Sequence, residues 1–240
     1  MFSHPEIWIL AAGIFLGYFA QTIVGFAAAL ISFPFLLRVY TLPEATAFLA
    51  FYYVIFSAVL VYKNRKDVDI KVFKDLALPA FLGYIIGFVI LTTVNPVWLE
   101  RGLGIFVICY SAYEFKFKKV FNIPKILFNV FGFFGGIFGG IFSSGGSFFV
   151  PLIASRIKNA INIRATLLAV FAIANFSRFP FVIVSGDLTK AIFTKSLIIL
   201  PVFLLAIICG QKAYNYISEK VLKNLILVFL FISGVFLVLK

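Results

Sequence analysis

The sequence predicts an all-α, polytopic integral membrane protein made of two inverted-topology repeats. Three observations lead there: the composition is strongly apolar, the two halves of the chain align with each other, and each half opens with an overlong apolar block. Of the 240 residues, 63% are hydrophobic and 12% are charged, about half the charged content of a soluble domain. Apolar runs of membrane-spanning length recur along the chain, so we expect one transmembrane domain over residues 1–240.

The alignment of the two halves indicates an internal duplication. When Pro34 is set against Pro151, the residues that follow repeat their order after small shifts. We therefore divide the domain into repeat 1, residues 1–120, and repeat 2, residues 121–240. The clearest matches pair Ala45, Thr46, Ser57 and Asp67 with Ala165, Thr166, Ser177 and Asp187.

Each repeat contains four apolar blocks, and all of them are expected to be helical. Lipid favours helices because every backbone hydrogen bond must close within the segment. At about 1.5 Å per residue, an opening block of roughly thirty residues measures about 45 Å, longer than the hydrocarbon layer of roughly 30 Å. The blocks are residues 7–38, 43–62, 72–94 and 98–115 in repeat 1, and 125–155, 165–185, 191–211 and 221–239 in repeat 2.

Glycines in the opening block of repeat 2 predict where its helix breaks. This block contains the stretch GGIFGGIFSSGGSFFVP, residues 135–151, and glycine weakens a continuous helix. Each repeat is then a broken or re-entrant helical hairpin followed by three transmembrane helices. The sequence leaves open whether the opening block is such a hairpin or two full helices.

The net charge of +12 indicates orientation in a membrane rather than nucleic-acid binding. Cytoplasmic loops of membrane proteins carry an excess of Lys and Arg, and they face anionic lipid. If each opening block returns as a hairpin, most basic residues fall on one side of the membrane, and both termini are predicted outside. The basic loops are then residues 63–75, 116–125, 155–164 and 211–223.

The helix breaks are the candidate substrate-binding elements. A helix that restarts exposes backbone N–H groups at its beginning, where partial positive charge attracts anions. Inverted repeats with interrupted helices are typical of transporters whose site lies near the membrane midplane, between the repeats. The predicted binding residues at the two breaks are Gln21, Thr22, Gly25, Ser143, Ser144, Gly145, Gly146 and Ser147.

Arg178 adds a charge to this predicted site. It lies well inside the block 165–185, where a charge costs at least about 2.5–3.5 kcal/mol on insertion scales. We therefore include Arg178 in the substrate site, together with Asn175 one turn earlier. Its alternative roles are structural, as a partner for carbonyl groups at a helix C-terminus, or as a side chain that snorkels toward the outer interface of the membrane. The nine acidic residues can all be placed in loops or near segment ends, so the predicted cargo is a small anion.

Close helix packing is the alternative interpretation of the glycine pairs. Small residues four positions apart allow two helices in a membrane to approach closely. We interpret Gly13, Gly17, Gly83 and Gly87 in this way.

The residues favour a transporter over an enzyme. An enzyme needs a nucleophile with a base at membrane depth, and the only histidine, His4, is terminal. Cys109 and Cys209 form no CxxC motif or Cys/His cluster, so we expect no metal and no cofactor. An anion channel and a non-transporting accessory protein remain alternatives. The expected partners are a small anionic solute and membrane lipid, without nucleic acid, and a homodimer is left open.

With these features, the chain resembles the TauE/SafE sulfite exporter family of transmembrane permeases for small sulfur compounds and organic anions. The resemblance is carried by two Gly-rich opening runs that end in proline, GYFAQTIVGFAAALISFP and GGIFGGIFSSGGSFFVP. It implies export or uptake of sulfite, an organosulfonate or a related sulfur oxyanion. We therefore predict a secondary carrier or permease in a bacterial or archaeal inner membrane, working by alternating access.

Overall fold

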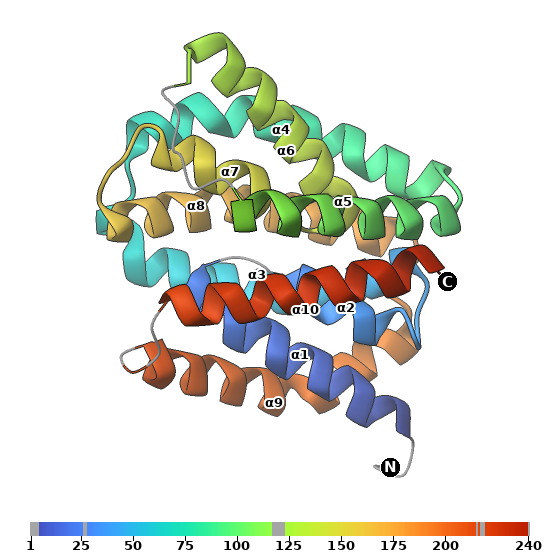
Figure 1. Ribbon diagram of the computed structural model, residues 1–240. Helices are drawn as coiled ribbons and strands as arrows, with labels where there is room; N and C mark the ends of the chain where they lie inside the picture. Colours follow the sequence, from blue (N-terminus) through green and yellow to red (C-terminus); the bar gives the residue numbers. More distant parts are fainter. Residues whose placement is uncertain (1–4, 26–27, 117–122, 215, 217–218, 240) are drawn as a thin grey trace. The chain divides into compact units, whose positions relative to one another are not determined.

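The computed structural model describes residues 5–25, 28–116, 123–214, 216 and 219–239, and every regular element in these ranges is a helix (Figure 1). The all-α prediction is therefore confirmed. Six of the described helices are long and apolar enough to cross a membrane. Most of the predicted basic loop 116–125 lies outside the described residues. The helices are α1 (Pro5–Val24), α2 (Ala28–Leu36), α3 (Leu42–Asn64), η1 (Arg65–Asp67), α4 (Ile70–Thr93), α5 (Pro96–Lys116), α6 (Lys125–Phe142), α7 (Gly146–Ala154), α8 (Ala160–Val184), α9 (Lys190–Tyr214) and α10 (Glu219–Leu239).

Both opening blocks are broken into a long helix and a short one. The first block forms α1 and α2, and the second forms α6 and α7. The short helices α2 and α7 contain nine residues each, which is about 14 Å of helix against a hydrocarbon layer of roughly 30 Å. Because neither short helix can cross alone, the opening block is not two full transmembrane helices.

Each short helix folds back along the long helix before it. In the first block, the Ser32 hydroxyl of α2 donates a 2.9 Å hydrogen bond to the carbonyl of Gly13 in α1. A Cβ added at Gly13 would lie 2.8 Å from Phe35 Cβ, so this glycine is a packing residue, as predicted. In the second block, the rings of Phe138 in α6 and Phe148 in α7 lie 5.3 Å apart. Both opening blocks are therefore helical hairpins.

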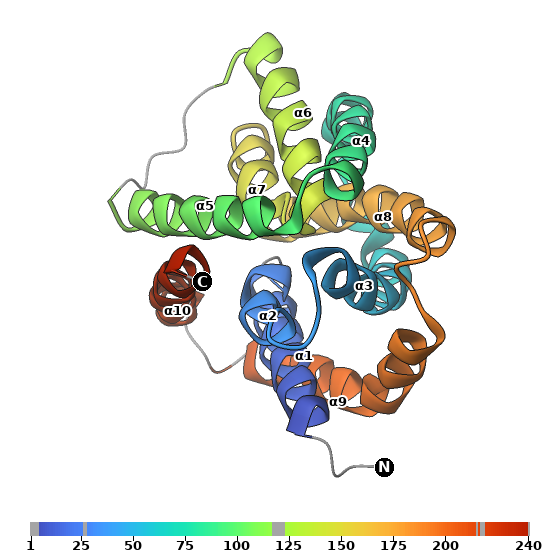
Figure 2. The ribbon, with the colours of Figure 1, turned by 90° about the vertical axis from the view of Figure 1, so that its right-hand side faces the viewer.

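The described helices form two compact units, and each unit combines helices from both halves of the chain. Unit 1 contains α1, α2, α5, α9 and α10, unit 2 contains α4, α6, α7 and α8, and α3 passes from unit 1 into unit 2 after Phe48. In unit 1, α1 packs against α2 and α9, and α5 packs against α10. In unit 2, α6 packs against α7 and α4, which lies beside it in Figure 2. Unit 1 comprises residues 1–48, 94–118 and 188–240, and unit 2 comprises residues 49–93 and 119–187.

In unit 2, α4 and α6 run parallel and touch at backbone level. Gly83 and Gly87 of α4 face Gly136 and Gly140 of α6. A Cβ added at Gly87 would lie 2.8 Å from the Cα of Gly140, and one added at Gly83 would lie 2.8 Å from the backbone nitrogen of Ile137. Small residues permit such close crossings in membranes, where packing drives helix association. The packing interpretation of Gly83 and Gly87 is confirmed.

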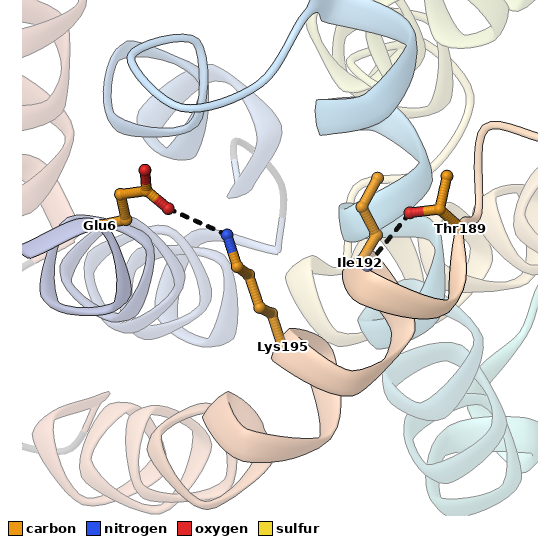
Figure 3. Close-up of polar contacts among 4 residues, drawn as sticks. All are labelled: Glu6, Thr189, Ile192 and Lys195. Carbon is orange, nitrogen blue, oxygen red and sulfur yellow. Dashed lines mark hydrogen bonds and ion pairs between the residues drawn. The ribbon is translucent and has the colours of Figure 1, made fainter. Parts of the chain in front are cut away.

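In unit 1, α1 and α9 make the corresponding parallel pair. Near their starts, Lys195 Nζ lies 3.0 Å from Glu6 Oε2 (Figure 3), and further along, a Cβ added at Gly210 would lie 2.8 Å from Thr22 Cβ. The long helix of each hairpin thus packs on a helix from the other half of the chain. This correspondence agrees with the predicted duplication, whereas the inverted orientation of the repeats stays a prediction.

The Glu6–Lys195 ion pair is a surface feature of unit 1. The two side chains are 52% and 30% exposed, respectively, and such pairs contribute only about 0–1 kcal/mol. Lys195 Nζ also lies 5.5 Å from the ring centroid of Tyr40. Burial, followed by the charges of Glu44 and Glu6, raises the pKa of Tyr40 to about 12, so this ring faces Lys195 as a neutral phenol. Close by, the Thr189 hydroxyl accepts a 3.3 Å hydrogen bond from the N–H of Ile192 at the start of α9 (Figure 3).

Candidate functional site

Most of the predicted binding residues lie at two helix breaks, one in each compact unit, and the other two lie on α8. Gln21, Thr22 and Gly25 stand at the end of α1 in unit 1. Asn175 and Arg178 lie on α8 in unit 2. Unit 2 also holds the residues of the second break, Ser143, Ser144, Gly145, Gly146 and Ser147. The two breaks belong to equivalent hairpins, and their hydrogen bonds differ.

At the first break, polar groups of the chain bond to one another. The side-chain oxygen of Gln21 accepts a 3.0 Å hydrogen bond from the N–H of Ala28, the first residue of α2. The Thr22 hydroxyl donates a 2.6 Å bond to the carbonyl of Tyr18 within α1. Gly25 has φ +89°, which glycine adopts without strain, and its N–H bonds to the Gln21 carbonyl at 2.7 Å. A neutral oxygen of the protein thus occupies the start of α2.

At the second break, α7 begins without a side-chain cap. After α6 ends, Ser143 takes a left-handed conformation with φ +53°, uncommon for a residue other than glycine. Gly145 is the N-cap residue of α7, and it provides no side-chain cap for the start of this helix. A Cβ added at Gly145 would lie 2.8 Å from the carbonyl oxygen of Gly135, so the tight turn requires glycine. Because the first N–H groups of a helix lack intrahelical partners, α7 presents donors together with the positive end of its dipole.

Two hydroxyl groups at the second break are buried without a hydrogen-bond partner in the described part of the chain. They belong to Ser143 and Ser147. The residue Ser147 is 8% exposed, and the neighbouring Ser144 is 5% exposed. An unsatisfied buried polar group costs about 1–3 kcal/mol, and buried polar groups in proteins are nearly always paired. The second break therefore carries unused donors, whereas Gln21 and Thr22 at the first break have hydrogen-bond partners.

Arg178 contacts the end of α6, next to the second break. Its side chain is buried, with 2% exposure, and its Nη2 donates a hydrogen bond to the carbonyl of Gly140 in the last turn of α6. The guanidinium carbon lies 5.0 Å from the ring centroid of Phe88. The structural role considered for Arg178 is thus present, because it binds a carbonyl at a helix C-terminus. Its Nε still has no partner among the described residues.

Two tyrosines that the sequence pattern did not indicate surround the same region. Tyr53 of α3 donates a 3.5 Å hydrogen bond to the carbonyl of Ser143, and Tyr53 and Tyr84 both interact electrostatically with Arg178. They are 5% and 2% exposed. A tyrosine in an apolar segment is equally typical of an interfacial aromatic belt, so no motif distinguished these two before the fold placed them.

Asn175 connects α8 to α3 one turn before Arg178. Its Nδ2 donates a 2.8 Å hydrogen bond to the hydroxyl of Ser57. The hydroxyl of Ser177, the neighbour of Arg178, bonds back to the carbonyl of Ile173 at 2.7 Å, which is common for serine within a helix. Asn175 therefore helps to position this part of α8, and Ser177 is already satisfied within its own helix.

The second break brings together three kinds of group that can bind an anion. It combines the start of a helix, two unpaired hydroxyls and a guanidinium that pairs with no carboxylate in the described residues. Hydrogen bonds from charged donors to anions are shorter and stronger than neutral ones, and a helix N-terminus attracts negative charge.

Six bilayer-length helices define the class: this is a multi-pass membrane protein. The family model of the sulfite exporter TauE/SafE matches residues 9–237, nearly the whole chain. The chain therefore belongs to the TauE/SafE family, which is a family of membrane transporters for sulfur compounds and not of enzymes. The resemblance drawn from the Gly-rich runs is confirmed. Comparisons with curated proteins and with solved structures found no match.

Proposed function

We propose that this protein is a secondary carrier that moves a small sulfur oxyanion, such as sulfite or an organosulfonate, across a bacterial or archaeal inner membrane. The anion binds at the second helix break, where the first N–H groups of α7 and the hydroxyls of Ser143 and Ser147 donate to its oxygens. Alternating access then exposes the bound anion to one side of the membrane at a time. Membership of a transporter family for sulfur compounds supports this assignment.

The difference between the two helix breaks carries the proposal. Gln21 closes the start of α2 with its own oxygen, whereas the start of α7 has no side-chain cap and has unpaired hydroxyls next to it. The start of α2 is thus capped by a side chain of the protein, whereas the start of the equivalent helix, α7, is not. An oxyanion with several acceptor atoms supplies what the second break lacks, because each of its oxygens accepts more than one hydrogen bond.

Arg178 supplies the positive charge of the proposed site. It approaches the second break from α8 and shares Tyr53 as a neighbour with Ser143. Its bond to Gly140 fixes one side of the guanidinium, and Nε remains available. In this arrangement Arg178 both stabilises the end of α6 and attracts the anion.

The orientation of the chain is part of the proposal, and cysteine labelling tests it. The exposed Cys109 and Cys209 are first replaced by serine, and single cysteines are introduced as Lys66→Cys or Lys190→Cys. A membrane-impermeant maleimide added to intact cells should label Lys190→Cys alone, because the basic side of the membrane faces the cytoplasm. Both variants should react after permeabilisation. Labelling of Lys66→Cys in intact cells would contradict outside termini.

Removing the two unpaired hydroxyls tests the site itself. The double variant Ser143→Ala/Ser147→Ala should bind sulfite at least about ten-fold more weakly, because a hydrogen bond to a charged group contributes about 1.5–3 kcal/mol. Binding is measured on purified protein, under exclusion of oxygen, from the rise of the unfolding temperature with sulfite concentration. Counterflow of labelled sulfite into proteoliposomes, an exchange typical of carriers and not of channels, should slow in parallel.

A control variant separates this effect from general damage. Ser177→Ala removes a hydroxyl that is already bonded within α8, so sulfite affinity should not change. Gln21→Ala removes the cap of α2 and should lower stability by about 1 kcal/mol, and its sulfite affinity tests whether Gln21 also belongs to the site. Wild-type affinity in the double serine variant would remove the second break from its assigned role.

A further inference from the structure

Arg178 is a buried cation whose immediate partners are all neutral. It bonds to the Gly140 carbonyl and lies over the Phe88 ring. The titratable groups that face it are the phenols of Tyr53 from α3 and Tyr84 from α4. In this unit, the other charged residues on the helices around Arg178 lie near helix ends or in η1, and α7 has no charged residue. They are Lys63 on α3, Lys71, Lys74 and Asp75 on α4, Lys125 on α6, Arg164 on α8, and Arg65, Lys66 and Asp67 in η1.

The second break therefore contains a single full charge at neutral pH. The other groups that face it are phenols, hydroxyls and backbone N–H groups, which carry no charge at neutral pH. A buried charge without an opposite charge costs several kcal/mol even after the surroundings relax. One negative charge on the bound solute cancels the charge of Arg178, whereas two leave an uncompensated negative charge in its place.

We propose, on the basis of the proposed function, that the second break selects its anion by charge and binds singly charged sulfur oxyanions. Hydrogen sulfite and organosulfonates belong to this class. Doubly charged sulfite and sulfate are rejected, although their oxygens could accept the same hydrogen bonds. The neutral donors position the oxygens of the anion, and the single charge of Arg178 determines which net charge of the anion is favoured.

Charge selection gives sulfite a pH dependence that organosulfonates lack. Sulfite takes up a proton near neutral pH, and only the protonated, singly charged form is competent to bind. Above the pKa of the substrate, the competent fraction falls about ten-fold per pH unit, and the apparent affinity falls with it. An alkylsulfonate keeps one negative charge over the whole range, so its affinity stays constant. Sulfite transport therefore carries a proton on the substrate itself.

Binding of three sodium salts to the purified full-length protein tests this inference. Methanesulfonate is singly charged throughout, sulfate is doubly charged throughout, and sulfite changes between the two, so thermal-shift titrations are made at pH 6, 7 and 8.5 with oxygen excluded. Methanesulfonate should bind equally at each pH. Sulfite should weaken at least ten-fold between pH 6 and pH 8.5, and sulfate should bind at least ten-fold more weakly than methanesulfonate.

The variants Tyr53→Phe and Tyr84→Phe identify the group that titrates. If the proton is on the substrate, the sulfite profile keeps its midpoint in both variants. A shifted midpoint would place the titration on a phenol and overturn the inference, as would sulfate binding as tightly as methanesulfonate. Failure of all three salts to bind at any pH would instead overturn the proposed function together with the inference.

Discussion

The variant Arg178→Gln is expected to lose at least about thirty-fold in sulfite affinity while remaining folded. Truncating one partner of a buried, hydrogen-bonded charge pair costs about 2–5 kcal/mol in binding, and Arg178 is the one full charge assigned to the site. The unfolding temperature without anion should change little. The variant loses the hydrogen bond to Gly140. It also avoids the free-energy cost of burying a charge that has no carboxylate partner, and this gain offsets the loss.

The two roles of Arg178 predict different sulfite affinities for this variant. If the guanidinium served only to satisfy the end of α6, Arg178→Gln would leave sulfite affinity unchanged. Arg178→Lys provides the matched control, because lysine keeps the charge but cannot reproduce the planar fork. Lysine should retain measurable binding with the same preference for singly charged anions. Equal affinities in the wild type and Arg178→Gln would remove Arg178 from the substrate site.

The substitution Gly136→Val should prevent unit 2 from forming its α4–α6 crossing. Even the first added carbon would overlap the carbonyl of Ala80, and that carbonyl belongs to the backbone of α4 and cannot rotate away. Overpacking a tight contact costs about 1–3 kcal/mol and occasionally more. With three added carbons pressing on a helix backbone, we expect a loss of more than about 4 kcal/mol. The measurements are the yield of monodisperse protein in detergent and its unfolding temperature.

Gly102→Val is the matched control for this prediction. Gly102 lies on α5, and a Cβ added there meets no atom within 4 Å. Valine is a somewhat better helix former than glycine, so stability should be unchanged or slightly higher. A Gly136→Val protein as stable as Gly102→Val would show that α4 and α6 do not depend on their close approach.

Much of the fold follows from the sequence, and the reason is the membrane. In lipid, these apolar blocks must form their backbone hydrogen bonds internally, as a helix does. The all-α class and the positions of the spans could therefore be predicted from hydropathy alone. The breaks also could be predicted, because glycines and an overlong block point to the same place. The lengths of α2 and α7 decided between a hairpin and two full helices. That choice depends on where each helix actually ends.

The candidate site could be predicted only in part. Arg178 could be predicted as a site residue because a charge inside an apolar block has a high free-energy cost, whichever helices pack around it. The difference between Gln21 and Ser147 was not predictable, because both are polar residues near a glycine and the sequence does not show which groups bond to each other. Tyr53 and Tyr84 come from α3 and α4 and meet Arg178 of α8 only after the chain has folded.

The sequence by itself determined that this chain is a helical membrane protein with two interrupted opening blocks and one positive charge inside an apolar block, because those properties depend on local composition and on the cost of polar groups in lipid. Only the tertiary structure decided that Gln21 caps the first interruption, that the second retains unpaired hydroxyls, and that Arg178 meets Gly140. Hydrogen-bond partners are chosen by distance in space, and residues far apart in sequence come within bonding distance only when the helices pack.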